Sequence, residues 1–526
     1  MSPTRIMWTY LRNHRDQVLL ALLSGALLCL AFPKIDQGWL AWFALVPLLA
    51  ALRQADVRTG WVLGVVAGLA HFLGLMYWTA YTMNVYGGVP LVQALCVLLL
   101  LAAILAMFLA VFTTAVCLLC RTPLELLLLG PGLWVLTEWL RIWIFTGFPW
   151  ELLGYSQQAN MWLLQSADLF GVLGLSGLIL FGNAVVCLAI LHWRGRTWQS
   201  HAVGRGLVLR AGALLAGLLL FAAAYGLYRL HATDAQVAQA PKARIAVIQG
   251  NIDQAHKWDP SFQRQTTVKY RNLSLKAAKD GAELIVWPET ATPFYMYYDT
   301  ELTDIVLEGV KAAHTYFIIG SPSAEPSGKQ FLYYNRAYLL TPQAAVIGKY
   351  DKVHLVPFGE YVPLKRWLPF LGKMVAQVGD FMAGHQGNTL VWKEHPIGML
   401  VCYEVIFPEL ARAMTQNGAQ LLVNITNDAW FGRTSAAYQN FSMAVFRAVE
   451  NRRFLVRSAN TGISGFIDPC GRVLAATALY EDAALTADVA LLSSRTLYSR
   501  WGDGPLVVLC ALLVVLCVVR RRVYPA

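Results

Sequence analysis

The stretch Ile397-Gly-Met-Leu-Val-Cys402-Tyr403-Glu404 is an apolar strand pattern that ends on a cysteine and then becomes polar. A buried strand that ends in this way brings its last side chain to the edge of a sheet. Two other segments of the same region, Trp287-Pro288-Glu289 and Tyr350-Asp351-Lys352, place charged residues after similar runs. Together they predict a layered α/β domain with a glutamate, a lysine and a cysteine near its strand ends.

Short apolar runs alternate with helical patterns on both sides of this stretch. The expected strands are residues 244–249, 283–287, 316–319, 331–340, 398–402, 420–425, 454–458 and 463–468, and the expected helices are 261–279, 301–314 and 435–451. Alternation of this kind is typical of an α/β domain whose strand ends carry the site.

The composition of the whole chain excludes an ordinary soluble protein. Of 526 residues, 57% are hydrophobic and only 14% are charged. Such a chain is an integral membrane protein with a soluble part. Its formal net charge of +11 is spread over short connectors and not gathered on one basic face. The charge therefore indicates membrane topology, and we expect no nucleic-acid partner.

Long gaps between charged residues predict eight membrane spans, because about 20 residues cross the hydrocarbon core. The gaps are 16–34, 36–53, 58–121 (two spans with a turn at 87–90), 124–145, 168–194, 210–229 and 504–519. We expect three parts: a membrane domain at 1–230, an extramembrane domain at 231–503 that begins with a polar linker at 231–242, and a last span with a basic tail at 504–526.

Arginines occur in the connectors that follow the even-numbered spans, as in the connector with Arg194 and Arg196. The odd-numbered connectors contain almost no basic residues. By the positive-inside rule, both termini are cytoplasmic and residues 231–503 lie on the outer side. No Ala-x-Ala cleavage site follows the first span, so it is expected to remain as a helix.

Most cysteines serve as small apolar residues, since seven of the nine lie in apolar runs (Cys29, Cys96, Cys117, Cys120, Cys187, Cys510 and Cys517). Only Cys402 and Cys470 remain for the extramembrane domain. We expect Cys402 to be free, with one disulfide between the two as the alternative. No Cys/His cluster has metal-ligand spacing there, so neither a metal nor another cofactor is expected.

The residues at the strand ends fit cysteine chemistry. A thiol needs a base in reach, and Glu289 suits this role if an apolar pocket raises its pKa. Lys352 and the backbone N–H after the nucleophile would stabilise the anion formed when a carbonyl is attacked. The alternative is that Cys402 is a core residue and that Glu289 and Lys352 are surface charges.

The sequence around these residues resembles the carbon–nitrogen hydrolase (nitrilase) superfamily. The segments that carry the resemblance are Gln249-Gly250-Asn251, Trp287-Pro288-Glu289-Thr290-Ala291, residues 350–360, Cys402-Tyr403-Glu404 and residues 427–432. With the flanking spans, the whole chain resembles the family of bacterial apolipoprotein N-acyltransferases. The resemblance implies an α-β-β-α sandwich, Glu289 as the base, Lys352 beside the oxyanion, Cys402 as the nucleophile, and Glu360, Tyr403 and Glu404 in support.

The resemblance also implies a reaction in two stages. Cys402 takes an acyl chain from a membrane phospholipid, typically phosphatidylethanolamine, and forms a thioester. The amine of the diacylglyceryl-cysteine of an apolipoprotein then accepts the chain as an amide. The implied location is the bacterial inner membrane with a periplasmic catalytic domain.

Both substrates keep their acyl chains in the bilayer, so a route for lipid is needed. Residues 364–381 combine aromatic residues such as Trp367 and Phe370 with basic ones, and we expect a mobile arm that dips into the interface. A packed surface loop is the alternative. Trp258 and Trp430 are further candidates for the substrate path, with core packing as their alternative.

Two other classes of function compete with acyl transfer. A membrane-anchored amidase would use the same three residues with water as acceptor, but one span would tether it. A transporter needs polar or broken helices near the midplane. Glu138 and Arg141 are the obvious charged pair within the spans, and a structural pair is the alternative explanation for them.

Overall fold

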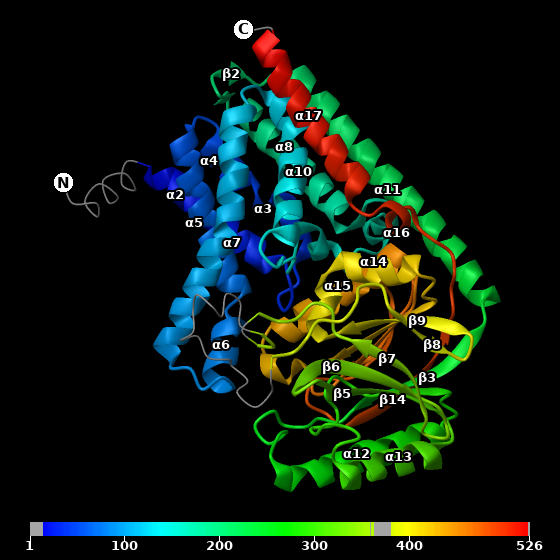
Figure 1. Ribbon diagram of the computed structural model, residues 1–526. Coiled ribbons are helices and arrows are strands. Elements are labelled where there is room, and N and C mark those ends of the chain that lie inside the picture. The colour runs from blue at the N-terminus through cyan, green and yellow to red at the C-terminus, as the bar shows by residue number, and fades with distance from the viewer. Residues whose placement is uncertain (1–13, 358, 362–379, 524–526) are drawn as a thin grey trace. The chain divides into compact units, whose positions relative to one another are not determined.

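The computed structural model describes residues 14–357, 359–361 and 380–523, and the chain divides into two compact units (Figure 1). Unit 1 consists of Met1–Ala80, Pro90–Tyr228 and Trp501–Ala526 within these limits. Unit 2 consists of Tyr81–Val89 and Arg229–Arg500.

Unit 1 is built from helices. They are α2 (Arg15–Leu30), α3 (Ala41–Ala44), α4 (Val46–Leu52), α5 (Val57–Leu75), α7 (Leu91–Leu119), α8 (Pro123–Trp143), α9 (Met161–Leu164), α10 (Ala167–Trp193), α11 (Arg205–Gln239) and α17 (Gly504–Val523), with α6 (Trp78–Val85) at the boundary of the units. Within the described ranges, five are long and apolar enough to cross a membrane: α5, α7, α10, α11 and α17.

The expected number of eight spans is therefore not confirmed. Helix α2 has only 16 residues, and Glu138 and Arg141 lower the mean hydropathy of α8. The expected linker at 231–242 was also wrong in part, because α11 continues to Gln239. Alanines and glutamines favour the helix there, and no proline interrupts it before Pro241.

Helices α5 and α7 pack closely along a stripe of small residues. A Cβ added at Gly64 would lie 2.2 Å from the Thr113 hydroxyl oxygen and 2.5 Å from Cα of Ala110. The Thr113 hydroxyl donates to the carbonyl of Gly60 across the interface at 2.7 Å. Small residues that let two backbones approach are the usual means of helix association in membranes.

Glu138 and Arg141 are both buried in unit 1, with 5% of each residue exposed. A carboxylate oxygen of Glu138 accepts a hydrogen bond from the backbone N–H of Leu153 at 2.7 Å. Arg141 donates to the carbonyl of Glu151 at 3.4 Å, and both side chains line a small cavity with His71. These contacts tie α8 to the segment that follows it, as the structural alternative predicts.

Unit 2 has the expected layers. Two sheets lie between α12 (Pro260–Lys279) with α13 (Thr300–Ala313) on one side and α14 (Pro408–Gln416) with α15 (Ala436–Asn451) on the other (Figure 1). One sheet has the order β14-β3-β4-β5-β6-β7 and the other β13-β12-β11-β10-β9-β8. Their bounds are β3 Lys242–Gln249, β4 Leu284–Val286, β5 Tyr316–Ser327, β6 Gln330–Leu340, β7 Val346–Asp351, β8 Thr389–Trp392, β9 His395–Val401, β10 Leu421–Thr426, β11 Leu455–Ala459, β12 Gly465–Ile467, β13 Val473–Ala476 and β14 Ala483–Ala490.

Each sheet has three parallel strands at its centre with antiparallel strands around them. The parallel strands are β3, β4 and β5 in one sheet and β9, β10 and β11 in the other. Ser458 of β11 joins the sheets, because its hydroxyl lies 3.0 Å from the carbonyl oxygens of both Ile248 and Val286. The α-β-β-α fold expected from the motifs is confirmed, and the carboxyl ends of β4 and β9 carry the site.

The apolar contacts of α12 and α13 fix the segment that leads to Glu289. Trp287 is 1% exposed and packs against Tyr270 of α12, with ring centroids 5.0 Å apart. Its indole N–H donates to the hydroxyl of Ser274 at 2.8 Å, so the buried donor is satisfied. This anchoring holds the chain in place two residues before the carboxylate.

A methyl group at Gly64 should loosen the contact between α5 and α7. We expect Gly64→Ala to destabilise the protein by roughly 1–3 kcal/mol, as overpacking does. Gly217→Ala on α11 is the matched control, because no atom lies within 4 Å of a Cβ there. Thermal unfolding of both variants in detergent measures the difference, and equal midpoints would contradict the close packing.

Candidate active site

Cys402 begins the turn η3 (Cys402–Ile406) directly after β9. Its backbone has a φ of 53°, in the left-handed region that residues other than glycine rarely adopt. The side chain is a partly exposed free thiol, close enough to Glu289 and Lys352 for their charges to act on its pKa. The expected free cysteine at a strand end is confirmed, and the disulfide alternative is excluded.

Glu289 follows β4 and is 6% exposed. One oxygen of its carboxylate accepts a hydrogen bond from the Asn335 amide at 2.7 Å, and the other accepts from the backbone N–H of Asn427 at 3.0 Å. Gly320 of β5 makes room for this segment, because a Cβ there would lie 2.3 Å from the carbonyl oxygen of Pro288. Hydrogen bonds to both oxygens therefore hold the carboxylate, and the contact with Gly320 holds the backbone of the same segment.

Lys352 follows β7 and is 1% exposed. Its Nζ lies 3.3 Å from Oε1 of Glu289 and 3.0 Å from Oε1 of Glu360. Burial acts to lower the pKa of Lys352, but the charges of Glu360 and Glu289 outweigh it and raise that pKa well above its usual value. The ammonium therefore stays charged between two carboxylates, as a buried ion must.

The charges of the site separate the protonation states of Glu289 and Cys402. Burial acts to raise the pKa of Glu289, but Lys352, the Asn335 amide and Lys257 leave it below its usual value. The condition of a raised pKa for Glu289 is not met, because the pocket contains cations. Burial and the Glu289 charge raise the pKa of the Cys402 thiol despite Lys352. The resting pair is a carboxylate and a neutral thiol.

Glu404 joins the two strand ends that carry Lys352 and Cys402. One carboxylate oxygen accepts from the backbone N–H groups of Val353 at 2.5 Å and His354 at 3.0 Å. The other accepts from the backbone N–H of Val401 at 2.7 Å and the hydroxyl of Tyr350 at 3.1 Å. Burial raises the pKa of Glu404 to about 7, opposed by these backbone donors and the Lys352 charge.

The two other supporting residues also lie at the site. Glu360 binds Lys352, accepts from the Asn335 amide at 2.8 Å and accepts from the backbone N–H of Val356 at 2.8 Å. Tyr403 directly follows the nucleophile and packs its ring against Phe407 with centroids 5.1 Å apart. The structure thus brings Glu360, Tyr403 and Glu404 together with the three central residues.

Sequence reasoning missed Asn335, which donates to both carboxylates from the middle of β6. A polar residue inside an otherwise aromatic and apolar strand was the available signal. It also missed Thr426 and Asp428, which are hydrogen-bonded to each other at 2.7 Å below Cys402. Arg457 neutralises Asp428 at 2.7 Å, in a pair that is almost fully buried.

The structure describes two of the four aromatic candidates for the substrate path, Trp258 and Trp430. Trp258 is partly buried beside Lys257, whose ammonium lies 5.9 Å from the ring centroid. Trp430 is partly buried, accepts from the Thr82 hydroxyl through its carbonyl at 2.8 Å, and packs edge-on against Tyr86. Trp367 and Phe370 lie outside the described residues, as does most of the expected arm at 364–381.

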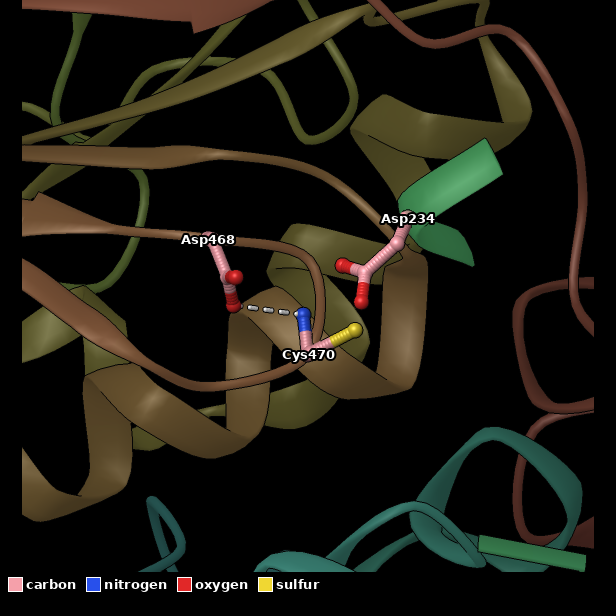
Figure 2. A group of neighbouring side chains, drawn as sticks. All are labelled: Asp234, Asp468 and Cys470. Atoms are coloured by element: carbon pink, nitrogen blue, oxygen red, sulfur yellow. Dashed lines mark hydrogen bonds between the residues drawn. The ribbon is translucent and has the colours of Figure 1, made fainter. Parts of the chain in front are cut away.

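One group of possible metal ligands occurs in the part of the chain that the structure describes. Asp234, Asp468 and Cys470 face one another within 4.8 Å (Figure 2). Arg472 binds Asp234 at 2.6 Å and Asp468 at 3.3 Å, and so supplies the positive charge that this group requires. Burial raises the pKa of the Cys470 thiol to about 11, which makes it a poor ligand at neutral pH. The group is an ion-pair cluster.

The fold and the site define a class, the carbon–nitrogen hydrolases. The profile described as carbon-nitrogen hydrolase matches residues 244–497, and the profile described as apolipoprotein N-acyltransferase N-terminal domain matches residues 24–185. Among solved structures, a mutant amidase from Nesterenkonia sp. AN1 aligns with a TM-score of 0.36 and 23% identity, over 49% of this chain and 94% of the amidase.

Relatives align over nearly the whole chain. A protein of Geobacter metallireducens named apolipoprotein N-acyltransferase is 45% identical over 490 residues, which is 93% of this chain and 92% of the relative. One of the same name from Methylococcus capsulatus is 34% identical over 515 residues, 96% of each chain. The chain belongs to the apolipoprotein N-acyltransferase family, and the resemblance seen in its motifs is confirmed.

The Cys402 thiol should react slowly with iodoacetamide near neutral pH. Because burial raises its pKa, the thiolate fraction is small, and we expect the alkylation rate to rise about tenfold per pH unit between about pH 7 and 9. Mass spectrometry of the Cys402 peptide measures this rate, with Cys402→Ser as the blank. A rate that levels off below about pH 8 would contradict the raised pKa.

Proposed function

We propose that Cys402 carries an acyl chain, as a thioester, from a membrane phospholipid to the N-terminal amine of the diacylglyceryl-cysteine of an apolipoprotein. Family membership makes the chain an acyltransferase that acts in lipoprotein maturation. The observation that carries the residue assignment is the ion pair between the Glu289 carboxylate and the Lys352 ammonium at 3.3 Å, near the Cys402 thiol, whose pKa both charges shift.

In the first stage, the Cys402 sulfur attacks the ester carbonyl of the phospholipid. Glu289 takes the thiol proton as the bond forms, which suits a resting pair of carboxylate and neutral thiol. Lys352 and the backbone N–H of Tyr403 stabilise the oxyanion. Its collapse breaks the ester bond, Glu289 returns the proton to the departing oxygen, and lysophospholipid leaves.

In the second stage, the neutral amine of the apolipoprotein attacks the thioester. Glu289 takes a proton from the attacking nitrogen and delivers it to the Cys402 sulfur, so an amide forms and the thiol is restored. Two moderate barriers replace one high barrier, as covalent catalysis requires. Phosphatidylethanolamine is the proposed donor, and the three central residues use no metal or other cofactor.

The supporting residues keep this arrangement during both stages. Glu360 and Asn335 hold Lys352 and Glu289 in place, and Glu404 fixes the strand ends. Tyr403 supplies the backbone donor. Each acts on the geometry and not on the reacting bonds.

We further place the enzyme in the bacterial inner membrane with eight spans, both termini in the cytoplasm and the catalytic domain in the periplasm. The distribution of arginines supports this topology. The short helix α2, the apolar residues Gly38–Leu52, and α8 would be the spans beyond the five apolar helices. Trp258 and Trp430 would border the path of the acyl chain, and Trp367 and Phe370 would belong to an arm that admits lipid.

Acyl transfer to an amine is favoured over hydrolysis of a small amide. A hydrolase of this class needs one anchor at most. The described part of this chain has five helices long and apolar enough to cross a membrane, and residues 24–185 match the N-terminal domain profile. The fate of the acyl group separates the two activities, because a transferase gives an amide and a hydrolase gives free fatty acid.

An acyl adduct on Cys402 is the direct test. Purified protein incubated with phosphatidylethanolamine should gain one acyl chain on the Cys402 peptide, and a diacylated lipopeptide should then discharge it as an amide. We expect Cys402→Ala to form no adduct, and Glu289→Gln to form it roughly 10²- to 10⁴-fold more slowly. Mass spectrometry follows both steps. Discharge to free fatty acid alone would favour the amidase.

Labelling with a membrane-impermeant maleimide tests the topology. In intact spheroplasts, we expect Lys329→Cys, on the exposed turn between β5 and β6, to be labelled, and Arg196→Cys, between α10 and α11, to be labelled only after lysis. Both native side chains are exposed. The reverse pattern would place the catalytic domain in the cytoplasm.

A further inference from the structure

A second buried ammonium lies beside the site. Lys257 belongs to the segment between β3 and α12 and is 1% exposed. Its Nζ donates to the hydroxyl of Thr290 at 2.7 Å and to the carbonyl of Glu289 at 3.4 Å. Unlike Lys352, it makes these hydrogen bonds to a hydroxyl and a carbonyl and not to a carboxylate. The roles proposed for the central residues leave this lysine unexplained.

The contacts of Lys257 fall on a strained turn. Thr290 has a φ of 45°, which is unfavourable for a β-branched residue and persists only where the surroundings hold it. Gly320 lies against Pro288 and Glu289 on this turn, where a Cβ would collide with the backbone. Lys257 binds this turn through the Glu289 carbonyl oxygen and the Thr290 hydroxyl oxygen. The turn sets the direction of the Glu289 side chain.

We propose that Lys257 is a positioning residue of the acyl transfer: its ammonium holds the Glu289–Thr290 turn and so fixes the carboxylate against the Cys402 thiol. This inference rests on the function proposed above. A misplacement of about 1 Å can cost roughly 10²-fold in rate, even when no reacting group is lost. Lys257 would therefore affect the rate of acylation more than lipid binding.

The charge of Lys257 adds a second, measurable effect. Burial lowers its pKa to about 7, opposed mainly by the charge of Glu289. The groups that face its ammonium are Glu289, Cys402 and the ring of Trp258. When Lys257 loses its proton above about pH 7, Glu289 loses a neighbouring cation, its pKa rises, and it becomes a stronger base. The neutral amine keeps two N–H groups for Thr290 and the Glu289 carbonyl, so the turn stays held. The acylation rate should therefore increase through this pH.

A double-mutant cycle tests the contact in the full-length purified protein. Lys257→Met removes the donor and the charge, and Thr290→Val removes the acceptor with little change of shape. We expect Lys257→Met to slow acylation of Cys402 by phosphatidylethanolamine about 10- to 100-fold, with less than about a threefold change in half-saturating lipid. The double variant should be no slower than Lys257→Met, because both changes break one contact.

The matched control is Lys269→Met on α12, a lysine whose ion pair with Asp482 is partly exposed to solvent; it should acylate at the wild-type rate. Additive losses in the cycle, or an unchanged rate in Lys257→Met, would overturn the inference. If Lys257→Met does not accumulate as folded protein, Thr290→Val alone tests the same contact. An unchanged acylation rate in Thr290→Val would then overturn the inference.

The pH profile separates positioning from general support of the fold. The rise in rate near pH 7 should be present in the wild type and in Lys269→Met and absent in Lys257→Met. A rise that persists in Lys257→Met would belong to Glu404, whose pKa is also about 7, and would count against Lys257. A wild-type protein that forms no adduct overturns the proposed function; an adduct at unchanged rate in Lys257→Met overturns this inference alone.

Discussion

The arrangement of unit 2 depends on the ammonium of Lys352, which is buried between the carboxylates of Glu289 and Glu360. A charge without water must be paired, so the strand ends that carry these groups have to meet within a few ångströms. Asn335 then donates to both carboxylates and fixes their spacing. The same ion cluster that the fold must satisfy also sets the protonation states that the chemistry uses.

These protonation states explain how Glu289, a weak base, and Cys402, a thiol with a raised pKa, can react together. Glu289 is kept ionised by cations, and Cys402 is kept neutral by burial and by Glu289. Neither group alone is strongly reactive. Their proton transfer becomes favourable only when a carbonyl receives the negative charge next to Lys352, which confines the reaction to a bound ester.

Apolar runs that end in polar residues predicted an α/β domain with Glu289, Lys352 and Cys402 near its strand ends. The α-β-β-α layers and the supporting carboxylates came only from the resemblance to the family. The sequence could not predict Asn335 or Lys257, since a single polar residue in a strand or a turn does not say which partner it meets. The sequence did not show the direction of the Glu289 pKa for the same reason: the cations that lower it, Lys352 and Lys257, come after β7 and before α12, far away along the chain. The count of eight spans stays a prediction beyond the five helices that are long and apolar enough within the described residues, because gaps between charges do not show where helices begin and end.

The neutral thiol of Cys402 has a consequence for redox chemistry. Oxidants and disulfides react with thiolates, and the fraction of thiolate falls as the pKa rises. On the proposed outer side of the membrane, Cys402 would meet an oxidising compartment with its disulfide-forming catalysts. If Cys402 stays protonated until an ester is bound, it would resist oxidation between turnovers. The burial that slows its reactions would therefore also keep it reduced.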